Sequence, residues 1–301
     1  GGYDGTDNTA VVESWNGTSW TETTDINTAR RELAGCGSSS TNALATGGKV
    51  PAGTAITESW NGSSWTEVND LNTARRAFPG VGTNTAALAF AGQPGSADTE
   101  SWNGTSWTEL NNVNTARYAH GGAGTQPSAL AFGGNNGSAN VANTELWNGT
   151  SWAEQNDLST ARYYLGGDGT STAALAFGGG PTDPFAGAGT TEEWNADADV
   201  GAWASGGNLN TARGFGSSAG PHAANLYFGG TPTTNNSTFS NNTESYDGSS
   251  WTELADLNQA KFASGGVGAS NTAALMYGGN IPGDTANTES WDGSSWTETS
   301  N

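Results

Sequence analysis

Six basic residues share one recurring context in a chain that is otherwise strongly acidic. The sequence holds 9 Lys and Arg against 29 Asp and Glu, a formal net charge of −20. Five of the six follow Thr-Ala and the sixth follows Gln-Ala: Arg30, Arg75, Arg117, Arg162, Arg213 and Lys261. Cations gathered by repetition could bind an anion. The alternative is an ion pair with a carboxylate in every repeat, an interpretation that strict repetition favours.

Residues for metal or nucleophilic chemistry are few. His120 and His222 lie in different sequence registers, which argues against a two-histidine metal site. Cys36 is the one cysteine, in the small-residue stretch AGCGSSS, and we expect it to be a buried structural residue. We therefore predict no metal and no cofactor. The acidity also argues against nucleic acid as a partner, because phosphate binders are basic.

Carboxylates are too widespread to single out a catalytic pair. Glycoside hydrolysis needs two positioned carboxyl groups, and no pair stands out here. The phrase SWNGTSW is one residue shorter than the Asp-box of sialidases. In the insertion EEWNADADVGAW (192–203), Asp197 and Asp199 fall well short of a calcium loop. The sequence therefore predicts a protein that is not an enzyme.

One tryptophan-rich phrase recurs along the whole chain. ESWNGTSWTE at 13–22 returns in close variants that begin at Glu58, Glu100, Glu145, Glu192, Glu244 and Glu289. Repeats of roughly 40–50 residues with strand-like content are typical of a β-propeller with one blade per repeat. We therefore expect an all-β fold, with four strands in each blade.

Each repeat offers four strand candidates. The first follows the basic residue, as in RRAFPGVG (75–82), and the second is an apolar run such as TAALAFAG (85–92). A short apolar run bounded by glycine suits a strand buried on both faces. The third and fourth strands are the arms of the tryptophan phrase, because Asn-Gly is a strong hairpin signal. Asp247 and Asp292 replace the Asn, so turn geometry explains this position better than a glycosylation site.

The hairpin register follows from a charge argument. A two-residue turn at Asn16–Gly17 pairs Trp15 with Thr18 and sets Glu13 opposite Trp20. A four-residue loop sets Glu13 opposite Glu22, and like charges directly opposed are unfavourable, so we predict the shorter turn. Either way the aromatic residues share a face, and we expect them to pack neighbouring blades together. These structural aromatic pairs are Trp15 and Trp20, Trp60 and Trp65, Trp102 and Trp107, Trp147 and Trp152, Trp194 and Trp203, Tyr246 and Trp251, and Trp291 and Trp296.

The order of Thr-Ala-Arg, an apolar strand ending in Gly-Gly, and an aromatic hairpin resembles the kelch repeat over essentially the whole chain. The short WNGTSW hairpin is similar to kelch-like repeats of marine bacteriophages and environmental bacteria, often in virion or surface proteins. Galactose oxidase is a kelch-type enzyme that needs copper-ligating Tyr and His beside a modified Cys. The single cysteine and two scattered histidines argue against that chemistry here.

The repeat count predicts one domain over 1–301 with an incomplete first blade. Residues 1–22 supply the outer half of that blade. Six blades are complete, at approximately 28–67, 73–109, 115–154, 160–203, 211–253 and 259–298. We expect a seven-bladed ring that lacks the inner strands of its first blade, with the chain a fragment. The alternative is a six-bladed ring with an additional hairpin.

The most variable segments lie between Gly-Gly and the hairpin, for example 93–98, 180–190 and 231–242. Such loops change specificity without disturbing a scaffold. We expect a noncatalytic structural or interaction propeller on a virion or cell exterior, binding a receptor, glycan or neighbouring subunit. Its partners would be protein or glycan on a surface, without membrane insertion. The alternatives are a multivalent lectin that uses aromatic pockets between blades and, less favoured, a glycosidase or oxidase at the channel mouth.

Overall fold

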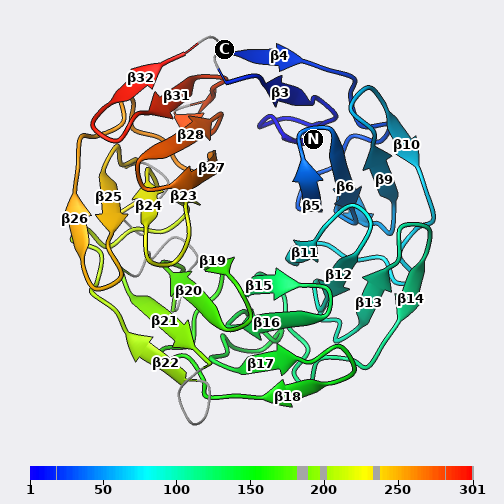
Figure 1. Cartoon of the computed structure of the whole chain (residues 1–301). Helices are drawn as coiled ribbons and strands as arrows, with labels where there is room; N and C mark the ends of the chain where they lie inside the picture. Colours follow the sequence, from blue (N-terminus) through cyan, green and yellow to red (C-terminus); the bar gives the residue numbers. More distant parts are fainter. Residues whose placement is uncertain (18, 182–188, 197–201, 233–237, 282, 300–301) are drawn as a thin grey trace. The chain divides into compact units, whose positions relative to one another are not determined.

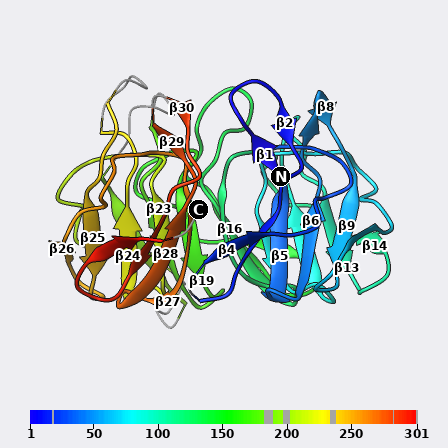
Figure 2. The same cartoon turned by 90° about the horizontal axis from the view of Figure 1, so that it is seen from above.

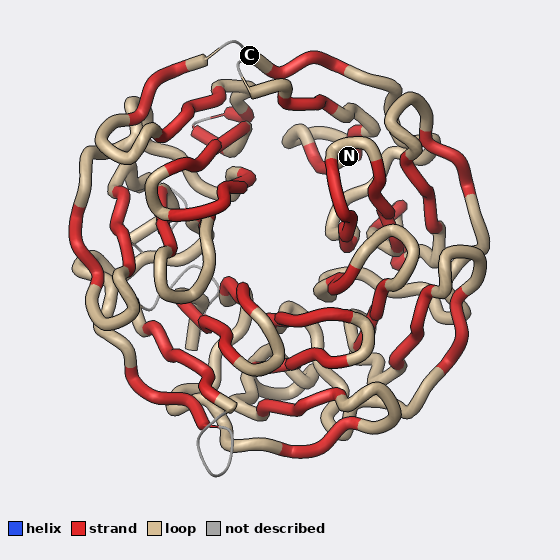
Figure 3. The backbone as a smooth tube through the Cα atoms, in the orientation of Figure 1, coloured by secondary structure: helices blue, strands red, loops and turns tan. Residues whose placement is uncertain are grey.

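Strands and loops make up the described part of the chain (Figures 1 and 3). The computed structural model describes residues 1–301 except 18, 182–188, 197–201, 233–237, 282 and 300–301. The chain divides into two compact units, Gly1–Asn156 and Asp157–Asn301. Within the described ranges there is no helix long and apolar enough to cross a membrane. The prediction of a single domain over 1–301 stays a prediction.

The chain forms six four-stranded antiparallel sheets, the blades of a β-propeller, three in each unit. In unit 1, blade 1 consists of β5 (Ala34–Ser39), β6 (Asn42–Thr46), β9 (Thr57–Trp60) and β10 (Trp65–Glu67). Blade 2 consists of β11 (Gly80–Gly82), β12 (Ala87–Phe90), β13 (Thr99–Trp102) and β14 (Trp107–Glu109). Blade 3 consists of β15 (Gly121–Thr125), β16 (Ser128–Phe132), β17 (Thr144–Trp147) and β18 (Trp152–Glu154). In unit 2, blade 4 consists of β19 (Gly166–Gly169), β20 (Ala173–Phe177), β21 (Thr191–Asn195) and β22 (Ala202–Ser205). Blade 5 consists of β23 (Ser217–Ala219), β24 (Asn225–Phe228), β25 (Thr243–Tyr246) and β26 (Trp251–Glu253). Blade 6 consists of β27 (Gly265–Ser270), β28 (Ala273–Tyr277), β31 (Thr288–Trp291) and β32 (Trp296–Glu298). β22 ends two residues beyond 203, the last residue of the range predicted for its blade.

Four short hairpins accompany the blades. They are β1 (Gly2–Tyr3) with β2 (Asn8–Thr9), β3 (Glu13–Trp15) with β4 (Trp20–Glu22), β7 (Lys49–Val50) with β8 (Ala52–Gly53), and β29 (Asn280–Ile281) with β30 (Gly283–Asp284). In Figure 2, the β1–β2 and β7–β8 hairpins of unit 1 project at the same end of its blades. The six complete blades and the additional β3–β4 hairpin are as the sequence predicted. The predicted seven-bladed closure stays a prediction.

The inner strand pair of each blade, meaning its first and second strands, combines glycine with large apolar residues. In β12, the residues from Ala87 to Phe90 are almost fully buried, as expected for a strand covered on both faces. A Cβ at Gly121 of β15 would lie 2.2 Å from the ring of Phe132 on β16. Glycine in the first strand therefore makes room for the aromatic ring of the second strand.

The first strand begins later than predicted. In blade 2 the prediction started at Arg75, but β11 starts at Gly80. The residues between them turn through Ala77, which has a φ of 52°. A left-handed residue interrupts an extended strand, and all six repeats have a left-handed residue two positions after the basic residue: Glu32, Ala77, Ala119, Tyr164, Phe215 and Ala263.

The core lies between consecutive blades within each unit. Leu88 and Phe90 of blade 2 belong to the same buried cluster as Trp147 and Trp152 of blade 3. The same arrangement joins blades 1 and 2, blades 4 and 5, and blades 5 and 6. The tryptophan pair of one blade therefore packs on the inner strand pair of the blade before it.

The predicted hairpin register is wrong. Trp15 lies opposite Trp20 and Glu13 opposite Glu22, and the other hairpins have the same aromatic pairing. In blade 1, Oδ1 of Asn61 accepts backbone N–H bonds from Ser63 at 2.9 Å and Ser64 at 3.0 Å, which stabilises a four-residue loop.

The charge penalty that argued against this register is small in the blades. Glu58 and Glu67 are directly opposed in blade 1. The Glu58 side chain is buried and bonded to Arg30, whereas Glu67 is exposed to water. One of the two charges is therefore compensated and the other is solvated, so their mutual repulsion does not decide the register.

Candidate functional site

The six repeated cations are buried in ion pairs with the first glutamate of the hairpin in the same blade. Arg30 pairs with Glu58, and the side chains of both are fully buried. The remaining pairs are Arg75–Glu100, Arg117–Glu145, Arg162–Glu192 at 3.1 Å, Arg213–Glu244 and Lys261–Glu289 at 3.5 Å. Each pair ties the segment before the first strand to the third strand of its blade.

Hydrogen bonds around the Arg30–Glu58 pair satisfy further polar groups of both side chains. Arg30 donates from Nε to the Gly47 carbonyl at 2.9 Å and from Nη2 to the Ala45 carbonyl at 3.0 Å. The second carboxylate oxygen of Glu58 accepts the backbone N–H of Asn27 at 2.6 Å. Burial alone would raise the pKa of Glu58, but the hydrogen bonds from Arg30 and Asn27 outweigh it and lower that pKa.

These contacts show what the six repeated basic residues do in the structure. All six basic side chains are fully buried, so none of them presents a charge at a channel mouth. The six residues that were candidates for anion binding therefore form ion pairs within the blades, which is the alternative given for them in the sequence analysis. A buried pair of this kind holds its partners strongly, because an unpaired buried charge is costly.

The aromatic pairs are also used in packing. Trp102 and Trp107 have ring centroids 5.4 Å apart, and both indoles are buried. Trp102 donates from Nε1 to the Asn84 carbonyl of its own blade at 3.0 Å, and Trp107 donates to Oγ1 of Thr57 in the preceding blade at 3.1 Å. The Trp102 and Trp107 indoles therefore take part in packing and hydrogen bonding within the blades.

The histidines and the cysteine do not form a site. His120 is buried against Phe90, and burial first, then the charge of Arg117, lowers its pKa well below the ordinary value. His222 lies in the turn between β23 and β24. Burial raises the pKa of the Cys36 thiol to about 12, as expected for an unreactive structural residue. Within the described ranges, no three His, Cys, Asp or Glu residues gather where they could hold a metal ion. Asp197 and Asp199 lie outside those ranges.

In unit 2, a connected series of aromatic rings lies at the start of the variable loops. Tyr163 forms a β-bridge with Gly180, and Phe262 forms one with Asn280. The residue directly after the repeated basic residue therefore pairs with the first residue of the variable loop in the same blade. The rings follow one another at centroid distances of 5.1 Å from Tyr163 to Tyr164, 5.8 Å to Phe215, 6.3 Å to Phe262 and 5.0 Å to Phe239. We call these five residues the aromatic series.

The aromatic series is partly open to solvent. Tyr164 is 42% exposed, and the other four rings are half-buried. Phe239 belongs to the variable segment 231–242 and stacks on Phe262 with an interplanar angle of 13°. Residues 182–188 and 233–237 of the variable segments lie outside the described residues. An accessible row of aromatic side chains beside variable loops is a common feature of binding surfaces.

In blades 1 and 2 of unit 1, the residue directly after the repeated basic residue is charged, as Arg31 and Arg76, whereas blade 3 has Tyr118. Arg31 and Lys49 line a hollow of about 690 Å³ with Tyr3 and Asp7. The Arg31 guanidinium lies 4.2 Å from the centre of the Tyr3 ring and donates to Asn8 at 3.3 Å. This hollow includes the β1–β2 and β7–β8 hairpins. The loop-side chemistry therefore differs between the two units, whereas the blade interiors repeat.

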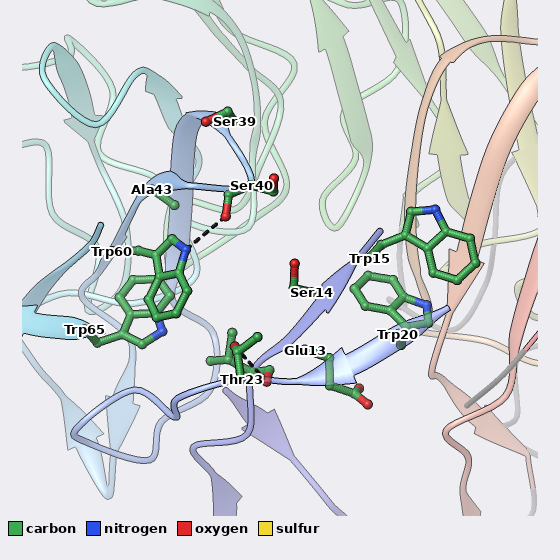
Figure 4. A pocket seen from close by; sticks show the side chains of 11 residues that line it. Glu13, Ser14, Trp15, Trp20, Thr23, Ser39, Ser40, Ala43, Trp60 and Trp65 are labelled. Carbon is green, nitrogen blue, oxygen red and sulfur yellow. Dashed lines mark hydrogen bonds between the residues drawn. The ribbon is translucent and has the colours of Figure 1, made fainter. Parts of the chain in front are cut away.

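A second cavity in unit 1 separates the β3–β4 hairpin from blade 1. Its volume is about 240 Å³ and its lining is mainly apolar. Figure 4 shows Trp60 and Trp65 side by side on one wall, with the Trp60 indole bonded to the Ser40 carbonyl, and Ser14 and Glu13 on β3. We call this space the β3 cavity; its lining residues are Val12, Glu13, Ser14, Trp15, Trp20, Thr23, Ser39, Ser40, Ala43, Trp60 and Trp65.

The sequence analysis placed the residues after the repeated basic residue in the first strand of each blade. The residues after Thr-Ala-Arg were read as an inner strand, which would have buried Tyr164 and Phe262. The signal that could have located them is the change of residue type at the two positions after the basic residue. Those positions read Arg-Glu in blade 1 but Tyr-Tyr in blade 4, which is unusual variation next to a basic residue that every complete repeat contains.

Two solved structures resemble the chain in fold. A structure of YjhT is 11% identical with a TM-score of 0.69, and the match covers 91% of this chain and 98% of YjhT. A fungal alcohol oxidase of the AA5 family, in complex with copper, is 13% identical with a TM-score of 0.69, and the match covers 91% of this chain but 64% of the oxidase. The chain thus spans less than two thirds of that enzyme's length, and identities this low show the fold alone. Neither a protein-family model nor a curated protein matches the chain, so the kelch-like identity stays a prediction.

Proposed function

We propose that this protein is a noncatalytic binding propeller, exposed on a virion or cell exterior, that recognises a receptor, glycan or neighbouring subunit through its variable loops. The observation that carries the proposal is the aromatic series of unit 2. Tyr164 and Phe262 sit beside segments that differ in length and sequence from blade to blade. Aromatic side chains supply large contact area at low entropic cost, which suits recognition.

The division of labour within each repeat supports the proposal. The repeated residues, such as Arg75, Glu100 and Trp107, are buried in ion pairs and packing. The non-repeated residues stand on loops, where sequence change does not disturb the blades. A high negative charge favours solubility and low nonspecific adhesion in an exposed protein.

A glycan array and surface-binding assays with candidate host cells test the proposal. We expect binding that is weakened at least about tenfold by Tyr164→Ala combined with Phe262→Ala, since interface aromatics often contribute more than 1 kcal/mol each. The matched control is Val267→Ala, which removes an exposed apolar side chain of β27 in the same unit. Binding that survives the aromatic double variant would contradict the proposed surface.

The fold likeness to an alcohol oxidase defines a second arm of the test. The protein, loaded with copper, is assayed for alcohol oxidation with detection of hydrogen peroxide. We expect no turnover above that of copper alone. Copper-dependent turnover would overturn the noncatalytic part of the proposal and leave the binding surface to be judged by the first arm.

A further inference from the structure

The aromatic series lies in a unit that exposes no lysine or arginine side chain. Residues 157–301 contain 15 Asp and Glu but 3 Lys and Arg. The three cations, Arg162, Arg213 and Lys261, are all among the described residues, and each is fully buried in an ion pair. His222 lies in the turn between β23 and β24, at the opposite end of blade 5 from Phe215. The surface of unit 2 is therefore negatively charged.

This charge selects among the ligands that could bind the aromatic series. A carboxylate or sulfate group would approach against the repulsion of the acidic side chains and would find no exposed lysine or arginine of unit 2 to pair with. A neutral sugar would gain nothing from the charge. An ammonium or guanidinium group would be attracted over about 10 Å, the range that salt screening allows, and would then meet rings whose faces attract cations. The charge therefore favours a cationic ligand.

The protein itself contains the contact that such a ligand would make. The Arg31 guanidinium lies 4.2 Å from the centre of the Tyr3 ring, within the range of about 6 Å over which a ring attracts a cation. Tyr3 is 48% exposed, close to the 42% of Tyr164 in the aromatic series. An exposed tyrosine of this protein therefore holds a guanidinium group at its surface.

The spacing of the rings matches an extended polypeptide. The ring centroids lie 5.8 Å apart from Tyr164 to Phe215 and 6.3 Å apart from Phe215 to Phe262. Alternate side chains of an extended chain project to the same side about 6.6 Å apart, because each residue advances the chain by about 3.3 Å. Cations at every second position of such a chain would therefore each lie beside one ring.

We propose that the aromatic series binds a basic segment of another protein, held in an extended conformation with Arg or Lys at alternate positions. The inference rests on the proposed binding function and narrows it, because it selects a protein partner over a glycan. The cations of the segment lie beside Tyr164, Phe215 and Phe262, and the side chains between them point away from the rings. The acidic surface of unit 2 attracts the segment, and the rings fix its position.

The probe is the peptide Arg-Thr-Arg-Thr-Arg-Thr-Arg, acetylated and amidated at its ends so that only its side chains carry charge. Threonine favours the extended conformation. In the matched control peptide, citrulline replaces every arginine and removes the charge with little change of shape. We expect saturable binding of the arginine peptide to the whole chain in calorimetry, with a Kd below about 1 mM in about 0.05 M NaCl. The citrulline peptide should bind at least about tenfold more weakly.

Variants of the protein separate the ring contact from general charge attraction. Tyr164→Leu keeps an apolar side chain but removes the ring, so it should weaken binding of the arginine peptide about three- to fivefold. Tyr164→Phe keeps the ring and should change the affinity by less than about twofold. The matched control is Tyr3→Leu, which removes a tyrosine of similar exposure from unit 1 and should leave the affinity unchanged. Thermal melting of each variant checks that it is folded.

The salt dependence of binding tests the contribution of charge. Raising NaCl from about 0.05 M to about 0.5 M should weaken binding of the arginine peptide at least about tenfold, because salt screens the attraction between the acidic surface and the peptide. An affinity that does not change with salt would contradict a ligand selected by its charge.

Other outcomes would also overturn the inference. One is the absence of binding by the arginine peptide at about 1 mM. Equal affinity of the arginine and citrulline peptides would show that the cation is not recognised. Binding that Tyr164→Leu leaves unchanged would place the peptide on acidic surface outside the aromatic series. A glycan whose binding requires Tyr164, with no binding of the peptide, would sink the cationic partner but keep the proposed binding function. That function itself fails if binding to glycans or cells survives Tyr164→Ala combined with Phe262→Ala.

Discussion

Val12 stands where the complete repeats have a threonine that accepts an indole hydrogen bond. Thr57 accepts from Trp107 at 3.1 Å and Thr99 accepts from Trp152 at 2.9 Å. Facing Val12, the buried Nε1 of Trp65 has no hydrogen-bond partner among the described residues. Val12→Thr should therefore raise the free energy of unfolding by about 1 kcal/mol, measured by urea denaturation.

The reverse change is the matched control. Thr57→Val leaves the Trp107 indole without its acceptor and should lower the free energy of unfolding by about 1–3 kcal/mol, because a buried donor then loses its partner. If both variants leave the free energy of unfolding unchanged, the indole bonds do not contribute to stability and the explanation of the threonine is wrong.

Arg75 and Arg76 are neighbours in sequence with very different environments. Arg75 is fully buried against Glu100, whereas the Arg76 and Glu32 side chains of the neighbouring ion pair are partly exposed. Arg75→Met should lower the free energy of unfolding by about 3–5 kcal/mol, because Glu100 remains as an uncompensated buried charge. Arg76→Met should cost less than about 1 kcal/mol. Equal losses of unfolding free energy for the two variants, measured by chemical denaturation, would contradict the structural role of the six repeated basic residues.

His120 occupies a position that is leucine in two other repeats, Leu33 and Leu165. Its pKa lies well below 6.5 in the folded protein because of burial and the nearby Arg117. As pH falls below about 6.5, the unfolded chain gains a proton that the folded chain does not, so stability falls. Relative to His120→Leu, the wild-type protein should lose up to about 1.4 kcal/mol per pH unit between about pH 6.5 and pH 5.

The control for this pH dependence is a change at the equivalent position of blade 4. Leu165 carries no titratable group, so Leu165→Val should keep the pH dependence of the wild-type protein. Thermal melts from about pH 7.5 to pH 5 would contradict the assignment if His120→Leu kept the same pH dependence as the wild-type protein.

At the scale of the element, the hairpin loop depends on an acceptor at its first position. Asn103 accepts backbone bonds from Thr105 and Ser106 at 2.9 Å each, and Asp247 accepts the equivalent bonds from Ser249 and Ser250. Asn103→Ala should lower the free energy of unfolding by about 1 kcal/mol, whereas Asn103→Asp should be close to neutral. Calorimetric melting measures the stability of both variants. Equal changes in stability would show that the acceptor at the first loop position does not stabilise the hairpin.

The register of this hairpin shows where sequence reasoning reached its limit. The Asn-Gly signal located the turn correctly, but the opposed glutamates argued for a loop two residues shorter. That argument, made for Glu13 and Glu22, treated the two glutamates of every hairpin as equivalent surface charges. Only the packed blade reveals that Glu58 is buried against Arg30, and a charge that is already paired carries little weight against the register.

At the scale of the whole molecule, a net charge of −20 is spread over a surface whose six repeated cations are buried. The exposed charges therefore repel one another, while the buried pairs are poorly reached by salt. Raising NaCl from about 0.02 M to about 0.2 M should raise the thermal midpoint by about 2–4 °C, equivalent to about 1 kcal/mol. A fall in the midpoint would mean that screened surface ion pairs matter more than repulsion.

The sequence alone determined the repeated parts of this protein. The recurrence of Thr-Ala-Arg, an apolar strand and a tryptophan hairpin specified an all-β propeller, its six complete blades, and the packing role of pairs such as Trp102 and Trp107. Periodic burial and turn chemistry are written locally in each repeat, and six copies average out the ambiguity of any one.

Only the tertiary structure decided how the non-repeated residues are used. It paired Arg30 with Glu58, and it gathered Tyr164, Phe215 and Phe262 into the aromatic series. These outcomes depend on distances between residues far apart in the chain. Sequence spacing gives such distances only where the residues repeat, and the aromatic series lies where they change from blade to blade.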